Sequence, residues 1–292
     1  MCSRSASTSE PIVNAAELLE RWRLDLESWA IPEEILAAVA ESPWELPRQL
    51  FARRATRRRE APSGPSFQRA WEALDPSGCL LDVGAGGGAA SLPLAPRATE
   101  ITAVDGDQQM LSAFLDNSAG LGPPARGICG RWPDVAGEVA PADVVTCHHV
   151  LYNVPDLGTF VTELTAHARR RVVVEITARH PLTPLNPLWE HFHGLHRPTV
   201  PTAADAIAIL EALGLAPSHL AWSRPGELEY ESFDDLVEVT RRRLCLPESR
   251  AGDVGGALRE IGVGTARPSD LGSSATNLVT IWWDGVAPAA LD

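Results

Sequence analysis

A run of glycines behind a short apolar segment has the residue types and spacing of a binding loop for a nucleotide-like ligand. Residues 80–83 are apolar apart from Asp82, and Gly84, Gly86 and Gly88 follow at every second position. Glycine allows a tight turn with close backbone approach to a ligand, and a helix that begins after the turn presents free N–H groups and positive dipole charge. The sequence therefore predicts a strand, a ligand-binding turn and a short helix.

An acidic residue closes the next predicted strand. Asp105 lies 19 residues after Gly86, close to the separation of roughly 20 at which an acid meets a ribose diol. Gly84, Gly86 and Ala89 also satisfy the dinucleotide pattern G-x-G-x-x-G/A. The loop by itself therefore leaves an NAD(P)-dependent oxidoreductase open as an alternative.

The wider pattern separates these two interpretations. Asp82 stands two residues before the first glycine, Val104 and Asp105 end the second strand, and the segment 142–156 ends a fourth strand with HVLYNVPD. This set resembles the class I S-adenosylmethionine-dependent methyltransferases, whose loop at this point is commonly HVLxxVPD. The resemblance extends over about residues 79–177 and implies S-adenosylmethionine as cofactor.

The resemblance also implies roles for individual residues. The three glycines would pass under the methionine and ribose parts of the cofactor, Asp82 would hold its amino-acid end through water, and Asp105 would bind the ribose hydroxyls. Together, the expected cofactor-binding residues are Asp82, Gly84, Ala85, Gly86, Gly88, Asp105, Gly106, Arg131, Trp132 and His148.

Adenine recognition departs from the family pattern. The family often places an acidic residue after the third strand, where it faces the adenine amine, but this chain has Arg131 and Trp132. Because arginine cannot accept a hydrogen bond, we expect backbone groups and stacking on Arg131 or Trp132 to replace the acid.

Two adjacent histidines follow the fourth strand, at the edge where an open α/β sheet binds its ligands. His149 is the candidate general base, because an imidazole titrates near neutral pH. The alternative is a structural role within the HVL element. Residues expected around the acceptor are Tyr152, Asn153, Trp189, His191 and His193.

The segment from His180 to Arg197 follows the fifth strand and is expected to be a solvent-excluding lid. Its H-x-H-x-x-H spacing has no adjacent Asp and no cysteine pair, so no metal site is expected. Glu175, at the end of the fifth strand, is either an anchor for this lid or a carboxylate of the site.

The elements that must position these groups follow from apolar periodicity. Short continuous apolar strands alternate with helices after residue 76, which predicts a doubly wound, mainly parallel sheet of seven strands with helices on both faces. The last strand, 276–283, is expected to be antiparallel. Helices are predicted over 107–117, 156–169 and 202–215 and from Ser232, with caps at Asp107, Thr202 and Ser232.

The chain is expected to divide into a helical N-terminal cap region, 1–75, and a Rossmann-like domain, 76–292, with lid insertions at about 180–200 and 227–270. An arginine-rich helix at 46–59 offers two interpretations: a solvated face, or a cover that pairs with an anionic group. The sequence gives no indication of oligomeric state.

Composition limits the choice of partners. The 25 basic residues are all arginine, which excludes lysine chemistry, and a net charge of −13 opposes binding to nucleic acid. The five cysteines form no pair, no apolar run is long enough for a membrane helix, and no secretory signal is present, so we expect a cytoplasmic location. The favoured function is O- or N-methylation of a small molecule. A non-catalytic binding protein with the same fold is a further alternative.

Overall fold

The computed structural model describes residues 14–43, 63–224, 230, 232–264, 271 and 276–286. Within them a seven-stranded sheet has the order β3-β2-β1-β4-β5-β7-β6. The strands are β1 Gly78–Val83, β2 Ala98–Asp105, β3 Ala125–Cys129, β4 Ala142–His148, β5 Ala168–Thr177, β6 Ser218–Ser223 and β7 Asn277–Asp284. β7 lies antiparallel between β5 and β6, while the pairs among β1 to β5 are all parallel. The predicted fold class is confirmed.

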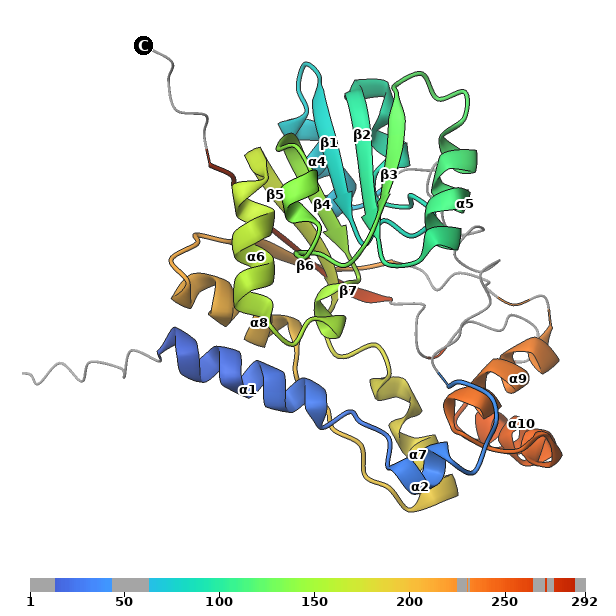
Figure 1. The fold of residues 1–292 in the computed structure, drawn as a ribbon. Coiled ribbons are helices and arrows are strands. Elements are labelled where there is room, and N and C mark those ends of the chain that lie inside the picture. The colour runs from blue at the N-terminus through green and yellow to red at the C-terminus, as the bar shows by residue number, and fades with distance from the viewer. Residues whose placement is uncertain are drawn as a thin grey trace, which may run out of the picture.

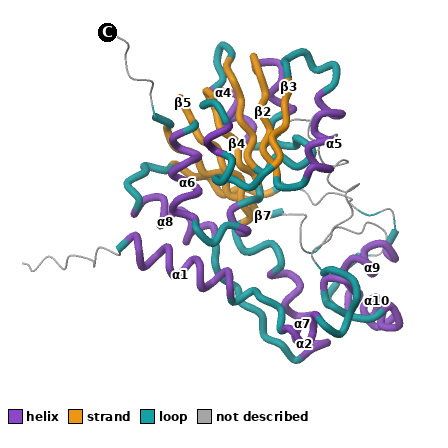
Figure 2. Tube along the Cα trace, viewed as in Figure 1, coloured by secondary structure: helices purple, strands orange, loops and turns teal. Residues whose placement is uncertain are grey.

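Helices cover both faces of this sheet, as Figures 1 and 2 show. One apolar cluster joins the sheet to the helices α1 Ala15–Glu27, α6 Leu157–Ala166 and α8 Ala203–Ala212. A second cluster joins the opposite face to α4 Pro65–Ala73 and α5 Gln108–Ser118. The central strands are buried on both faces, which explains their continuous apolar sequences.

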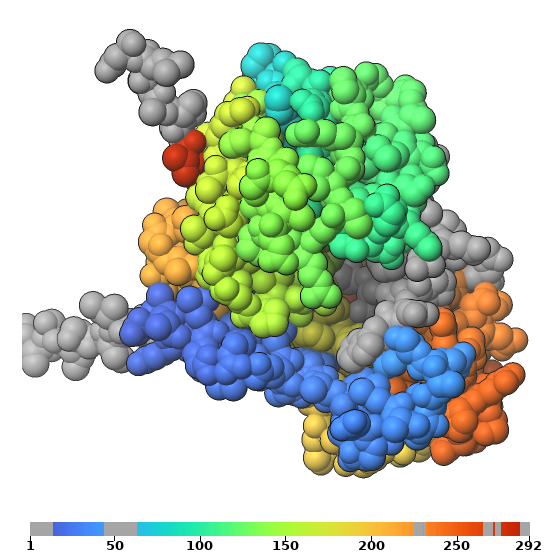
Figure 3. All heavy atoms as spheres, in the orientation of Figure 1, coloured from blue at the N-terminus to red at the C-terminus, as the bar shows by residue number. Residues whose placement is uncertain are grey.

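A third apolar cluster lies apart from the sheet. It is formed by the helices α2 Glu33–Leu36, α7 Asn186–His193, α9 Phe233–Arg243 and α10 Ala251–Glu260. Figure 1 shows these four helices together below the sheet. In Figure 3, α1 in dark blue lies along the base of the sheet domain and leads to the segment that meets α9 and α10.

Polar caps fix where several helices begin. Asp107 accepts from the backbone N–H of Gln109 and Met110 at the start of α5. Complete capping boxes, Thr202 with Asp205 and Ser232 with Asp235, begin α8 and α9. These three predicted starts are confirmed.

Two predicted elements differ from the structure. The helix predicted to reach residue 169 ends at Ala166, because Ala168 already pairs with Ala142 in the sheet. The short helix predicted after the glycines is present, but it is of the 3₁₀ type and begins later. Turns follow Gly88, and then a 3₁₀ helix spans Leu92–Arg97. Pro93 and Pro96 explain this, because proline cannot donate the hydrogen bonds of an α-helix.

The predicted cap region is divided among these layers. α1 packs on α6 and α8, and α4 packs on the sheet, whereas α2 joins the third cluster. The arginine-rich helix predicted at 46–59 lies outside the described residues. The division of the chain at residue 75 stays a prediction, as do the bounds of the second lid insertion.

Candidate active site

The glycine loop begins where β1 ends. Gly84, Gly86 and Gly88 all have left-handed backbone, with φ of 71°, 51° and 88°. A Cβ on Gly84 would lie 2.3 Å from the Val150 side chain, and one on Gly88 would lie 2.6 Å from Leu92, so packing requires both glycines. At Gly86 no atom lies within 4 Å of that position. The loop is therefore open to a ligand at Gly86, which fits the predicted cofactor.

Asp105 ties this loop to the end of β2. Its carboxylate accepts from the N–H of Gly86 at 2.8 Å and from the N–H of Asp107 at 2.9 Å. A carboxylate has about four acceptor sites, so capacity for two hydroxyls remains. Gly106 follows directly, and the side chain of Arg131 lies 3.8 Å from the position of a Cβ on it. The structure thus brings Gly86, Asp105, Gly106 and Arg131 together.

Asp82 lies in the protein interior, with 1% of its surface exposed. It accepts from the Ser91 hydroxyl at 2.6 Å and from the Thr146 hydroxyl at 3.0 Å. Burial raises the pKa of Asp82 to about 6. These bonds brace β1 against β4 and against the segment behind the glycine loop. A water-mediated contact with the cofactor stays a prediction.

Of the two residues expected at the adenine, Arg131 is exposed and Trp132 is buried. The Trp132 ring meets the His167 ring edge to face, with centroids 4.8 Å apart, within the core cluster of α6. Of the two residues, only Arg131 therefore has a side chain that is accessible for stacking on an adenine ring in this conformation.

His149 has an unusual backbone and a buried acid beside it. Its φ is 61°, a conformation that costs a non-glycine residue free energy and is found at functional sites. Its backbone N–H donates to the Glu175 carbonyl at 2.7 Å, and its Nε2 lies 3.1 Å from Glu175 Oε1. The His149 side chain is 40% exposed, whereas that of Glu175 is 3% exposed. Arg224 also reaches Glu175, at 3.4 Å. Glu175 thus lies beside the candidate base, and Arg224, which the sequence did not indicate, lies beside Glu175.

His148 is the last residue of β4 and pairs in register with Glu175 on β5. Tyr152 follows on the same edge, and its hydroxyl donates to the Thr177 carbonyl at 2.8 Å. Burial raises the pKa of Tyr152 well above its usual range. The Tyr152 hydroxyl therefore keeps its proton, and its ring is buried, while Asn153 is exposed.

Aromatic rings connect this edge to the N-terminal helix. Tyr152 stacks with Trp22 of α1 at 5.9 Å and meets His180 edge to face at 5.1 Å. His180 stacks on Trp29, with ring centroids 3.8 Å apart. Burial, together with the nearby Arg197 guanidinium, lowers the pKa of His180 to about 3, so this imidazole is neutral.

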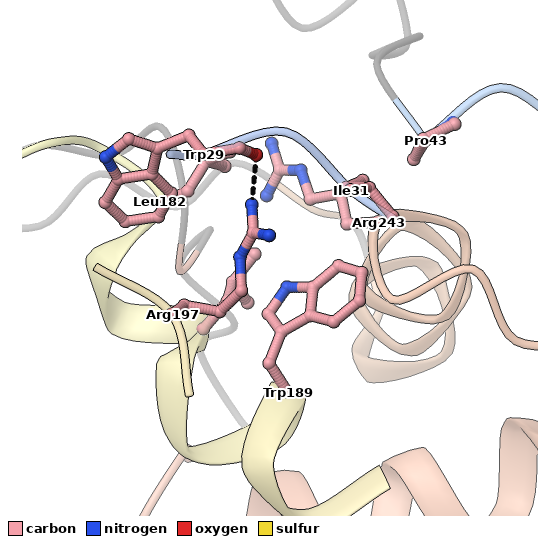
Figure 4. Close-up of a pocket in the computed structure, with 8 residues that line it drawn as sticks. Trp29, Ile31, Pro43, Leu182, Trp189, Arg197 and Arg243 are labelled. Carbon is pink, nitrogen blue, oxygen red and sulfur yellow. Dashed lines mark hydrogen bonds between the residues drawn. The ribbon is translucent and has the colours of Figure 1, made fainter. Parts of the chain in front are cut away.

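The three residues predicted on α7 do not share one cavity wall. Trp189 is buried and contacts Arg197, whereas His191 is exposed. His193 Nε2 lies 2.6 Å from the Leu244 carbonyl, which holds α7 against the end of α9. The side chain that Trp189 does contact is Arg197, whose guanidinium also lies over Trp29 (Figure 4). No spacing rule in the sequence connects these three positions.

Two kinds of feature are absent from the part of the chain that the structure describes. No group of three His, Cys, Asp or Glu side chains there could hold a metal ion. No described helix is long and apolar enough to cross a membrane.

Comparison with known proteins identifies the family. A family model described as a methyltransferase domain matches residues 53–220. The fold is similar to that of the YcgJ protein from Bacillus subtilis (TM-score 0.50, 17% identity, 76% of this chain and 99% of that one). It is also similar to that of a cyclopropane-fatty-acyl-phospholipid synthase-like protein from Lactobacillus casei (TM-score 0.52, 16% identity, 86% and 98%). No curated protein matches the chain.

The chain belongs to the methyltransferase domain family. It is an S-adenosylmethionine-dependent methyltransferase, as the resemblance implied. The oxidoreductase and the non-catalytic binding protein are therefore set aside.

Proposed function

We propose that this enzyme transfers a methyl group to an oxygen or nitrogen atom of a small-molecule acceptor, and that His149 removes the acceptor's proton. The observation that carries this proposal is the contact of His149 with the buried Glu175 at the carboxyl ends of β4 and β5. That edge of an open α/β sheet is where ligands bind.

The proposed mechanism gives the two ring nitrogens of His149 different roles. In this proposal Glu175 Oε1 accepts a hydrogen bond from His149 Nε2, 3.1 Å away, so that Nδ1 keeps its lone pair. As the acceptor's oxygen or nitrogen takes the methyl group, its O–H or N–H proton would pass to His149 Nδ1, and the electron pair of the broken S–C bond would stay on the cofactor's sulfur. Glu175 then faces the imidazolium and stabilises its charge, as a buried acid does for a general base.

Gly84, Gly86, Gly88, Asp105 and Gly106 are the residues proposed to hold the cofactor. S-adenosylmethionine supplies the electrophilic methyl group on a sulfonium. The protein's contribution is to align the acceptor with that group and to exclude water. Support for exclusion comes from Tyr152 and His180, which close the strand edge with buried rings.

The preference for a small acceptor is supported by the charge of −13, which opposes binding to a polyanion.

The test is an incubation with methyl-labelled S-adenosylmethionine and a metabolite panel, followed by mass spectrometry. We expect label on a hydroxyl or amine of a small molecule. With His149→Gln at neutral pH, labelling should fall to about 1% of the wild-type rate or less. Label on protein or nucleic acid from a cell extract, with none on small molecules, would contradict the proposal.

A further inference from the structure

Arg224 reaches the proposed active site from the edge strand of the sheet. It follows β6 directly, and its backbone N–H donates to the Thr276 carbonyl, just before β7, at 2.9 Å. Its side chain places Nη1 3.4 Å from Glu175 Oε1 on β5. Because β7 lies between β6 and β5, this arginine reaches past one strand to make the contact.

One carboxylate oxygen of Glu175 contacts two basic side chains. Oε1 lies 3.1 Å from His149 Nε2 and 3.4 Å from Arg224 Nη1. The side chains of Glu175 and Arg224 are 3% and 16% exposed, so water screens their interaction little. A guanidinium at this distance favours the ionised form of the carboxylate.

The charges around this oxygen influence which form of His149 is stable. Arginine is protonated throughout the pH range of the reaction, so Arg224 and an ionised Glu175 already balance each other. A proton on His149 adds a second positive charge beside the same carboxylate oxygen. Glu175 attracts that charge, whereas Arg224 repels it. Arg224 therefore favours the neutral imidazole, which is the form that can accept a proton.

The described neighbours of Glu175 in the sheet carry no fixed charge. His148 on β4 and Thr280 on β7 are in register with it. The nearby Tyr152 hydroxyl is neutral, because burial raises the pKa of Tyr152 well above its usual range. His148 also titrates, so a measurement on His149 must resolve the two histidines.

A second pair of glutamate and histidine in the chain shows what the arginine adds. Glu163 Oε2 lies 3.6 Å from His167 Nδ1 on α6, and no arginine among the described residues forms an ion pair with Glu163. The carboxylate at His149 differs because a buried guanidinium shares it. His167 therefore serves as a reference for any effect that is specific to Arg224.

We propose that Arg224 is a positioning residue for the methyl transfer: its guanidinium holds the Glu175 carboxylate toward His149 and keeps the imidazole neutral until the acceptor supplies its proton. The role in the reaction rests on the proposed function of His149. The effect of Arg224 on the proton of His149 is a property of the folded protein and is measured without an acceptor.

The test is an NMR titration of the histidine rings. The full-length protein, labelled with ¹³C-histidine and saturated with S-adenosylhomocysteine, is followed across the pH range in which histidine titrates. The signals of His148 and His149 are identified as those that His148→Gln and His149→Gln remove. In Arg224→Gln the pH at which His149 is half protonated should rise by about 0.5–1 unit relative to the wild type. An unchanged or lower midpoint would overturn the proposal, as would an equal rise for His167.

Further variants assign the effect to charge. Arg224→Lys keeps the positive charge, so its midpoint should lie closer to the wild type than that of Arg224→Gln, and an equal rise in both would contradict the proposal. Arg126→Gln is the matched control, because Arg126 pairs with Glu100 at 3.3 Å on other strands and should leave His149 unchanged.

Glu175→Gln gives a test that leaves Arg224 in place. This variant keeps the guanidinium beside His149 without the carboxylate, so the midpoint of His149 should fall below the wild-type value. It decides the question even where Arg224→Gln does not fold. A midpoint at or above the wild-type value would overturn the proposal.

Kinetics separate this inference from the proposed function. With the acceptor found by the labelling assay, the rise of kcat/KM with pH should move upward in Arg224→Gln together with the NMR midpoint. A moved midpoint with an unmoved rate profile would contradict the proposed role of His149 as the base, and with it the role of Arg224 in the reaction. A lower rate at every pH without a moved midpoint would make Arg224 structural and overturn this inference, while His149→Gln still tests the proposed function.

Discussion

His149 Nε2 lies 3.1 Å from Glu175 Oε1, and the backbone N–H of the same histidine donates to the Glu175 carbonyl. One glutamate thus holds both the main chain and the ring of this histidine. The left-handed backbone of His149 directs the residue away from the line of β4. Such a conformation persists only where the surroundings determine it, as this double contact does.

Glu175→Gln should lower kcat about 10- to 100-fold while KM changes little. Glutamine keeps the size of the side chain but cannot stabilise the imidazolium that forms during proton transfer, and general base catalysis is worth roughly 10²–10⁴-fold. Steady-state kinetics with the identified acceptor give both constants.

The matched control is Glu163→Gln. Glu163 of α6 also lies near a histidine, His167, at 3.6 Å, but His167 is packed on Trp132 in the core. This variant should retain the wild-type kcat. An equal loss of activity in both variants would mean that Glu175 acts on stability and not on the reaction.

Two glycine variants separate packing from ligand binding. Gly84→Ala should destabilise the fold by about 2–4 kcal/mol, because the new methyl group meets Val150 in a left-handed conformation. Gly86→Ala meets no atom and should cost only about 1–2 kcal/mol, yet it should weaken S-adenosylhomocysteine binding at least 10-fold. Urea unfolding and calorimetry measure the two quantities. Wild-type cofactor affinity in Gly86→Ala would show that the ligand does not approach this loop.

The stack of Trp29 on His180 should contribute to stability. Trp29 is 5% exposed, so Trp29→Ala removes a large buried side chain and should lower the free energy of unfolding by about 3–5 kcal/mol. Trp71 of α4 is partly exposed, and Trp71→Ala should cost less. Denaturant titration compares the two. A larger loss for Trp71 would indicate that the contact between Trp29 and His180 carries little of the stability.

Asp82 and His180 should make the free energy of unfolding depend on pH in opposite directions. The pKa of Asp82 is raised from 3.8 to about 6, so the folded state binds this proton more tightly, and the contribution of Asp82 to stability falls as pH rises through that range. The pKa of His180 is lowered from 6.5 to about 3, so its contribution is lost as pH falls below 6.5.

The single variants should therefore change the pH slope in opposite directions. Between pH 4 and pH 6, Asp82→Asn should make stability rise more steeply with pH, and His180→Gln should make it rise less steeply, each by about 1–3 kcal/mol over the range. Urea unfolding at several pH values measures both slopes. Changes of the same sign in the two variants would contradict the assigned shifts.

Much of the fold follows from local patterns in the sequence. Continuous apolar strands predicted the parallel sheet, and Asp107, Thr202 and Ser232 predicted helix starts that the structure confirms. The short helix predicted after the glycine loop forms as a 3₁₀ helix, because Pro93 and Pro96 cannot donate the hydrogen bonds of an α-helix.

The site was less predictable because it depends on contacts between strands and loops. Gly86 and Asp105 could be placed together from their spacing, and the structure joins them by a hydrogen bond. The contact of Glu175 with His149 follows from the register of β5 on β4, which no spacing reports. The contacts of Arg197 with Trp29 and Trp189 depend on how the helices of the third apolar cluster pack together.

The pH dependence of kcat for the wild-type enzyme and for His149→Gln tests the central claim most directly. The account predicts that the wild-type rate rises with pH through the titration of one group and then levels off. In His149→Gln the rate should be at least 100-fold lower at neutral pH and should rise with pH only as the acceptor itself loses its proton, while S-adenosylhomocysteine affinity is unchanged. A variant with the wild-type rate and the wild-type pH profile would contradict the claim, and His149 would then be structural.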